Sequence, residues 1–321
     1  MEEKMKKKLG TVTIAIALSM ILGLAGCAGG GTPQEAEPVP EPVTAQEPAP
    51  APEPEPEPEP TIQGEILIAV AASLQNAFEK ELIPLFNEQY PDVKVTGTYD
   101  GSGKLQTQIE EGLDAALFFS AATKQMDALA GSGLIDGETI VNLLGNEIVL
   151  ITGTEIEAGS GSSDNDEVIL HHVDDDGEIT SYPYTAVTGF ENITDAASIA
   201  IGDPASVPAG QYAEEILTSL GSWEEVAARA SFGMNVTEVL NWVAERSAEV
   251  GIVYMTDAAV MEDRVRVIAI APAGTLQTPV VYPVGLLANL GDREEAAAAF
   301  LKFLKSDDAA MIFTDYGFKT L

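Results

Sequence analysis

The sequence predicts an α/β protein of two lobes, each a mostly parallel β-sheet flanked by helices. Uncharged apolar runs, typical of strands buried on both faces of a sheet, alternate with segments of helical periodicity. Small and hydroxyl residues stand where these runs end and the helices begin. The length of 321 residues permits about two domains with an ample core.

The first 26 residues have the organisation of a bacterial export signal. Four of the first eight residues are lysine, and an apolar run follows over 12–24. Leu-Ala-Gly-Cys at 24–27 resembles a bacterial lipobox, so we expect Cys27, the only cysteine, to carry a lipid that anchors the protein in the membrane. The apolar run is shorter than the roughly 20 residues of a bilayer span, which argues against a retained membrane helix.

The lipidated cysteine and a tether rich in proline and glutamate make up residues 27–63. Such a composition cannot bury a core and favours extended polyproline II structure. At about 3.1 Å per residue, residues 28–63 reach on the order of 110 Å. We interpret them as a spacer between the membrane and the folded part.

The protein is strongly acidic, with a formal net charge of −35. Without the 4 basic and 10 acidic residues before Gly64, 12 basic and 41 acidic residues remain, a net charge of −29. Nucleic acid is therefore excluded as a partner, because its phosphates would be repelled. An anionic ligand would have to be held by local dipoles against this field.

The first predicted strand, 66–70, is followed by two alanines, by Ser73 and by a helix with an apolar face. Ser73 is thus expected at the carboxyl end of a strand and at the N-cap of a helix. Ligands bind at such ends in open α/β sheets, and free N–H groups there attract anions. The alternative is that Ser73 only caps its helix. Ser102 repeats this pattern in a glycine turn after a strand over 93–99.

Two more strand-to-helix turns are expected in the second lobe, which the chain enters at a strand over 147–152. In the turn after a strand over 198–201, Pro208 suits the first helical turn and leaves the amide of Ala209 accessible. Asn235 has the spacing of an N-cap for the second of these helices. A third strand ends in Tyr254. Later strands are predicted over 265–270 and 280–287, and later helices over 294–304 and 307–313.

An insertion over 155–190 interrupts this rhythm. Asp-Gly between β-prone runs at 168–173 and 178–187 predicts a hairpin. Both histidines lie in it as neighbours, and neighbours on a strand face opposite sides, so one metal ion is not expected to bind both. The aspartates lack EF-hand spacing.

The sequence lacks most of the residue combinations that form enzyme active sites. The folded part has no cysteine, no zinc-ligand spacing, no GxxxxGK[ST] loop and no histidine outside the insertion. The carboxylates include no pair at a strand-end motif of the kind a glycosidase needs. What remains is a set of uncharged donors at strand-to-helix turns, the chemistry of a dry anion site rather than of an enzyme.

Six stretches together resemble the molybdate-binding proteins of bacterial ABC importers, within the two-lobed extracytoplasmic solute-binding proteins. They are AVAASLQNAF (69–78), GSGKLQTQIE (101–110), LLGNEIVLI (143–151), GDPASVPAGQYAEEIL (202–217), GIVYMTDA (251–258) and YGF (316–318). The resemblance covers about 64–321 apart from the insertion.

The resemblance implies a periplasmic-binding-protein-like fold with the ligand between the lobes. Lobe 1 is expected to comprise 64–145 plus 257–321, and lobe 2 to comprise 146–256 with the inserted hairpin. The chain would cross near Asn146 and Met255, which predicts hinge-like closure linked to the ligand.

In this family two serine hydroxyls, a tyrosine hydroxyl and backbone amides hold a tetrahedral oxyanion without salt bridges. By position, these groups fall on Ser73, Ser102, Ala209, Val236 and Tyr254. The strand-to-helix pattern singles out the first three, and the resemblance adds the other two. It implies binding of molybdate and tungstate and delivery to an ABC permease by a monomer. No cofactor, no metal beyond the molybdenum of the oxyanion and no catalysis are implied.

The sequence departs from the family's pattern at Ala116 and Ala122, where relatives often carry aspartate. Lys104 beside Ser102 is unusual, and we expect it to be solvated rather than a ligand. Two alternatives stay open at this point: another tetrahedral oxyanion such as sulfate or phosphate, or an acidic surface sensor or adhesion lipoprotein.

Overall fold

The computed structural model describes residues 62–154, 169–173, 179–183 and 185–321. The predicted export signal, Cys27, nearly all of the tether and the predicted loop of the insertion lie outside the described residues. In the part of the chain that is described, no helix is long and apolar enough to cross a membrane.

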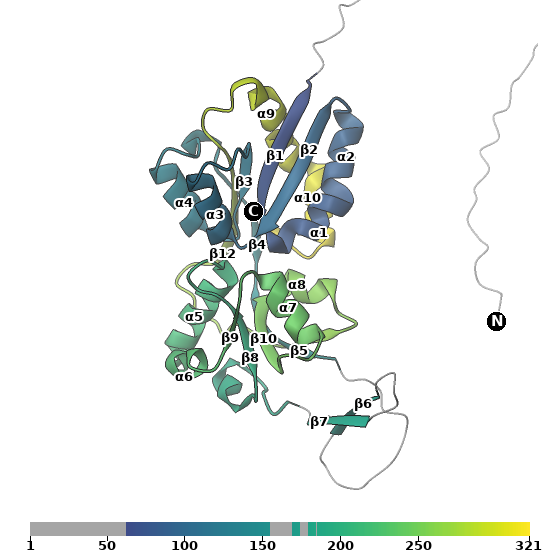
Figure 1. The fold of residues 1–321 in the computed structure, drawn as a ribbon, viewed down its shortest axis with the longest axis vertical. Helices are drawn as coiled ribbons and strands as arrows, with labels where there is room; N and C mark the ends of the chain where they lie inside the picture. Colours follow the sequence, from purple (N-terminus) through teal and green to yellow (C-terminus); the bar gives the residue numbers. More distant parts are fainter. Residues whose placement is uncertain (1–61, 155–168, 174–178, 184) are drawn as a thin grey trace, which may run out of the picture. The chain divides into compact units, whose positions relative to one another are not determined.

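A six-stranded sheet forms the core of the first lobe, in the order β13-β4-β12-β3-β1-β2 (Figure 1). β1 (Gly64–Ala71) pairs in parallel with β2 (Val93–Asp100) and with β3 (Leu117–Phe119). Antiparallel pairings join the remaining strands, which are β12 (Val280–Leu286), β4 (Val141–Asn146) and β13 (Lys319–Thr320). The sheet is therefore mixed rather than mostly parallel, and the strand predicted over 280–287, which is β12, is one of its antiparallel strands.

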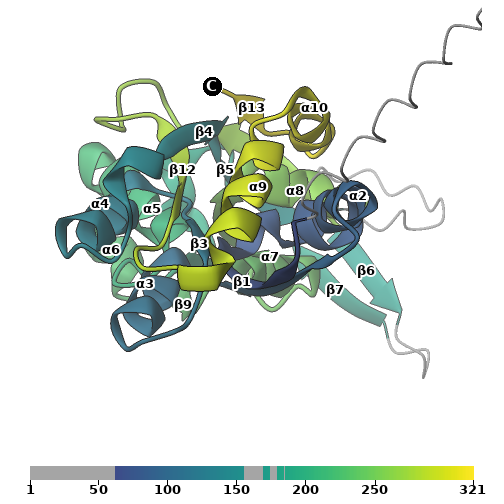
Figure 2. The ribbon, with the colours of Figure 1, turned by 90° about the horizontal axis from the view of Figure 1, so that it is seen from above.

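Helices from both ends of the described chain pack on this sheet (Figure 2). They are α1 (Gln75–Ala77), α2 (Ile83–Gln89), α3 (Ser102–Glu110), α4 (Thr123–Gly131), α9 (Glu294–Leu304) and α10 (Asp307–Asp315). A π-type segment, η2 (Phe78–Leu82), joins α1 to α2. The ring of Phe78 meets that of Phe119 edge-on at 5.9 Å, and Phe119 meets Phe313 at 6.2 Å. These buried rings fix the helix after β1 against the sheet, and with it the turn that carries Ser73.

A five-stranded sheet forms the second lobe, in the order β11-β5-β10-β8-β9. Its strands are β5 (Ile148–Gly153), β8 (Ile199–Gly202), β9 (Ser231–Gly233), β10 (Val250–Tyr254) and β11 (Val265–Ile270). β8 is parallel to β9 and to β10, whereas β5 is antiparallel to β10 and to β11. This sheet is mixed as well, and the prediction of a two-lobed α/β protein is confirmed.

Each parallel strand of the second sheet leads into a helix at its carboxyl end. The helices of this lobe are α5 (Pro208–Leu220), α6 (Trp223–Ala227), α7 (Val236–Ala244) and α8 (Met255–Val260). Short 3-10 turns complete the described structure: η1 (Ala72–Leu74), η3 (Gly137–Thr139), η4 (Phe190–Asp195) and η5 (Gly291–Arg293). The first turns of α5, α7 and α8 consequently lie at one edge of the sheet.

The chain passes between the two sheets at two places. The first passage is Glu147, which separates β4 from β5. The second lies between Ile270, the end of β11, and Val280, the start of β12. The predicted lobe boundary near Met255 would place β11 in the first lobe, but the strand pairs with β5 in the second sheet, so α8 and β11 belong to lobe 2.

The inserted segment contains a two-stranded sheet of β6 (Ile169–Val173) and β7 (Ile179–Pro183). The strands pair antiparallel, as the predicted hairpin requires, with His171 opposite Ser181.

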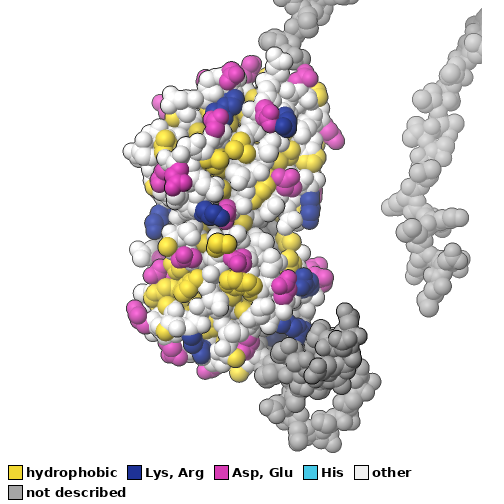
Figure 3. Space-filling model, viewed as in Figure 1, with side chains coloured by type: hydrophobic (Ala, Val, Ile, Leu, Met, Phe, Trp, Pro, Cys, Tyr) yellow, Lys and Arg dark blue, Asp and Glu magenta, His cyan; other side chains and the backbone are white. Residues whose placement is uncertain are grey.

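Figure 3 shows acidic side chains spread over both lobes on the face drawn, with lysines and arginines among them.

Candidate anion-binding site

A small cavity, with about 10 Å³ of free space, lies where turns of the two lobes meet. Its lining residues are Ala71, Ala72, Ser73, Asp100, Gly101, Ser102, Ala121, Val207, Pro208, Ala209, Val236 and Tyr254. The first seven lie at the ends of strands of the first sheet or shortly after them, and the other five belong to the second lobe. All five residues predicted to bind the oxyanion therefore line the same cavity.

Ser73 lies in η1, directly after β1, and does not cap the helix that follows it. The N-cap position belongs to Ala71, and no side chain caps this turn. The Oγ atom of Ser73 instead lies 3.1 Å from the hydroxyl oxygen of Tyr282 on β12. The simple capping role considered for Ser73 is thus wrong.

Ser102 is the first residue of α3, and Gly101 occupies the N-cap position. Its side chain is buried, and its Oγ atom accepts a hydrogen bond of 3.0 Å from the backbone N–H of Ala121. Because the oxygen is the acceptor in this contact, the hydroxyl proton of Ser102 remains available to a ligand.

Backbone amides reach the cavity from two helix N-termini. Ala209 and Val236 stand in the first turns of α5 and α7, where N–H groups have no intrahelical acceptor and the helix dipole favours an anion. The Asn235 side chain accepts from the N–H of Glu238 at 2.9 Å, which confirms the predicted cap and leaves the amide of Val236 to other partners.

Tyr254 is the last residue of β10, and its side chain is buried. Burial raises the pKa of its hydroxyl well above the ordinary value, so the group stays protonated and donates. It donates to the carbonyl oxygen of Ala121, at 3.4 Å. Tyr254, in the second lobe, therefore donates a hydrogen bond to a residue of the first lobe.

The carboxylate of Asp257 accepts a 3.1 Å hydrogen bond from the N–H of Tyr254, which occupies the N-cap position of α8. Burial raises the pKa of this carboxyl to about 7, although the hydrogen bond from Tyr254 acts in the opposite direction. The group therefore titrates near neutral pH.

Asp100 lines the cavity and was not predicted as a site residue. Its Oδ1 atom accepts from the N–H of Gly101 at 2.9 Å, and its Oδ2 atom lies 2.5 Å from Nζ of Lys104. Lys104 was expected to be solvated; its side chain is 45 % exposed and forms this ion pair. The pair offsets a negative charge beside the proposed anion site.

Direct hydrogen bonds join the two lobes around the cavity. The N–H of Gly103 donates to the carbonyl oxygen of Ser206 at 2.8 Å, and the Gln125 amide donates to that of Gln211 at 3.2 Å. A Cβ atom on Gly103 would lie 2.6 Å from the Ser206 oxygen, so glycine is needed for this approach. The structure therefore shows the two lobes in direct contact around the cavity.

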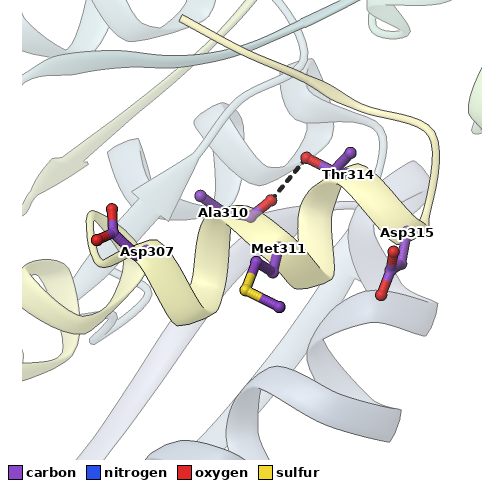
Figure 4. Close-up of a pocket in the computed structure, with 5 residues that line it drawn as sticks. All are labelled: Asp307, Ala310, Met311, Thr314 and Asp315. Carbon is purple, nitrogen blue, oxygen red and sulfur yellow. Dashed lines mark hydrogen bonds between the residues drawn. The ribbon is translucent and has the colours of Figure 1, made fainter.

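Another hollow lies along α10, lined by Asp307, Ala310, Met311, Thr314 and Asp315 (Figure 4). The Thr314 hydroxyl donates to the Ala310 carbonyl at 2.8 Å, and Met311 is 66 % exposed. Two aspartates and an occupied hydroxyl do not suit an anion, whereas the cavity between the lobes is lined by uncharged donors from both lobes.

Comparisons with known proteins place the chain in a family. A model described as bacterial extracellular solute-binding protein matches residues 66–319. YvgL of Bacillus subtilis, provisionally named an ABC transporter substrate-binding lipoprotein, is 35% identical over 79% of this chain and 85% of its own length. The molybdate-binding protein ModA of Haemophilus influenzae is 34% identical over 79% of this chain and 89% of its own.

The fold is also similar to that of solved structures. The periplasmic molybdate-binding protein of Azotobacter vinelandii superposes with a TM-score of 0.60, covering 79% of this chain and 98% of that one at 20% identity. Fold, family model and sequence identity agree. The chain belongs to the bacterial extracellular solute-binding proteins.

Proposed function

We propose that this protein binds molybdate, and also tungstate, outside the cytoplasm and delivers it to the permease of an ABC importer. The observation that carries the proposal is the convergence of five uncharged donors from two lobes on one cavity. The identity to a molybdate-binding protein over most of both chains supports the choice of ligand.

The donor set suits a fully ionised tetrahedral oxyanion, which only accepts hydrogen bonds. Ser73, Ser102 and Tyr254 would donate through hydroxyls, and Ala209 and Val236 through backbone amides; the Tyr254 proton would turn to the ligand from the Ala121 carbonyl. Hydrogen bonds to a charged group contribute roughly 1.5–3 kcal/mol each. Five of them, less the costs of desolvation and closure, are compatible with the roughly −8 to −12 kcal/mol of micromolar to nanomolar binding.

The lining contains no lysine, arginine or histidine. A carboxylate ligand usually recruits a bidentate arginine, so the lining favours an inorganic oxyanion over an organic acid. The same lining offers no nucleophile–base pair, which supports transport binding rather than catalysis. We further propose that the protein acts as a monomer, held at the membrane by a lipid on Cys27.

Calorimetric titration of the purified protein with molybdate, tungstate, sulfate and phosphate tests the proposal. We expect molybdate and tungstate to bind most tightly, each at one site per chain. If sulfate or phosphate bound more tightly than molybdate, that anion would be assigned as the ligand instead. Absence of binding by all four would favour the sensor or adhesion alternative.

A further inference from the structure

Tyr282 lies next to the proposed site without lining it. It is buried on β12, where its ring meets those of Tyr254 and Phe318 edge-on at centroid distances of 5.4 and 5.5 Å. Its hydroxyl oxygen lies 3.1 Å from Oγ of Ser73 and 3.3 Å from Nδ2 of Asn146. Tyr282 thus connects a proposed ligand residue to the end of β4.

The direction of these hydrogen bonds follows from the amide of Asn146. Its Oδ1 atom accepts from the N–H of Glu147 at 2.9 Å, and its Nδ2 atom donates to Oγ1 of Thr256 at 2.9 Å. With the carbonyl oxygen held in this way, the atom that faces Tyr282 is the amide nitrogen, which only donates. The hydroxyl oxygen of Tyr282 is therefore an acceptor from Asn146.

The single proton of Tyr282 then has Oγ of Ser73, at 3.1 Å, as an acceptor. Burial raises the pKa of this hydroxyl well above its ordinary value, although the contacts with Ser73 and Asn146 act in the opposite direction, so the proton is retained near neutral pH. Because Oγ of Ser73 accepts from Tyr282, the serine's own proton is left for another acceptor. If Ser73 instead donated to Tyr282, it would present a lone pair to an anion, which repels it.

We infer that Tyr282 is a positioning residue for the oxyanion: held by Asn146, it donates to Ser73 and so directs the only hydroxyl proton of Ser73 into the cavity. This inference rests on the proposed function. Asn146 ends β4 directly before the passage at Glu147, and Thr256 lies in α8 of the second lobe. The orientation of the donor is therefore set by residues from both lobes.

The test is a double-mutant cycle measured by calorimetry with sodium molybdate. Tyr282→Phe keeps the ring contacts and removes the hydroxyl, so we expect about tenfold weaker binding, the effect of roughly 1.4 kcal/mol. In a Ser73→Ala background the same substitution should have no further effect, because no serine proton is left to direct. A general packing defect would instead weaken binding equally in both backgrounds, and that result would overturn the inference.

Two further variants complete the experiment. Tyr90→Phe removes the hydroxyl of a tyrosine that stacks on Phe86 away from the cavity, and it should leave the affinity unchanged. Asn146→Asp replaces the donor facing Tyr282 by an acceptor and should also weaken binding, by more in the wild-type background than beside Ser73→Ala. If Tyr282→Phe does not fold, this second cycle decides, and equal losses in both backgrounds would overturn the inference. Failure of the wild type to bind molybdate would instead overturn the proposed function.

Discussion

Each hydroxyl at the cavity has one proton, and a second contact decides where that proton goes. The Ala121 amide occupies the oxygen of Ser102, and Tyr282 faces the oxygen of Ser73. Burial keeps the hydroxyl of Tyr254 protonated, and its proton, which lies toward the Ala121 carbonyl at 3.4 Å, must turn to reach a ligand. An uncharged site is selective for an acceptor-only ligand when such contacts leave its protons facing inward.

Replacement of Ser102 by alanine should weaken molybdate binding by at least about 2 kcal/mol, because a charge-assisted hydrogen bond is lost. The N–H of Ala121 would also lose its acceptor. Isothermal titration gives the change in affinity. Ser132→Ala is the matched control, since Ser132 donates to Leu129 at the end of α4. Equal affinity for Ser102→Ala and the wild type would remove Ser102 from the proposed ligands.

Asp257 should make folding stability depend on pH. Its pKa is about 7 in the folded protein, above the ordinary value of 3.8, so between these values the folded state binds more protons than the unfolded state. The contribution of Asp257 to the free energy of unfolding therefore falls as pH rises from about 4 to 7, by a few kcal/mol. Denaturation of the wild type and of Asp257→Asn at pH 5 and pH 8 measures it: the asparagine variant should gain stability relative to wild type at pH 8. If the wild type and Asp257→Asn differ in stability by the same amount at pH 5 and at pH 8, the raised pKa of Asp257 is contradicted.

Sequence alone predicts the residues whose positions follow from local pattern. Ser73 and Ser102 stand at junctions of an apolar run with a helical period, and the structure places both in the cavity. Asp100 directly precedes the predicted glycine turn, so its position was open to prediction, but its ion pair was not. Tyr282 stands inside a strand, 209 positions from Ser73, and only the antiparallel pairing of β12 brings it there.

At the scale of elements, the beginnings of helices bring the two lobes together. The first turn of α3 reaches the loop before α5 through the hydrogen bond of Gly103 with Ser206. The first turn of α5 also packs on the end of β8, where a Cβ atom on Gly210 would lie 1.9 Å from the carbonyl oxygen of Gly202. Small residues are thus required where backbones meet.

Gly103→Ala should weaken molybdate binding at least about fivefold, the effect of losing one hydrogen bond of about 1 kcal/mol. The added Cβ atom would meet backbone atoms of Ser206 at 2.6 to 3.0 Å, so the lobes could not make their present contact. Gly131→Ala in α4 meets nothing within 4 Å and serves as control. Equal affinities of the two variants would show that this approach is not needed for binding.

The strands were predictable because a buried apolar run is a local property of the sequence. The strand with which it pairs is not determined locally. The strand over 265–270 was predicted, but its pairing with β5 places it in the other lobe from the one expected. Likewise, the apolar pattern predicted a helix after Ser73 but not the 3-10 turn and the π-type segment within it. Both depend on how the chain packs onto distant elements.

At the scale of the molecule, the net charge of −35 opposes the approach of an anion. Salt shortens the range of this repulsion, from roughly 30 Å at 0.01 M to about 10 Å at 0.1 M. The association rate of molybdate should therefore rise roughly two- to tenfold between these ionic strengths. Stopped-flow fluorescence in sodium chloride measures it. A rate that falls with added salt would indicate positively charged groups at the entrance.

Both ends of the described chain belong to one sheet. β1 begins at Gly64, and β13 ends at Thr320, one residue before the carboxyl terminus. A mechanical load applied to the chain before Gly64 would consequently enter the first lobe alone. Within the described residues, two chain passages join the second lobe covalently to the first, so once the hydrogen bonds around the cavity open, its rotation would not pull on the amino-terminal segment.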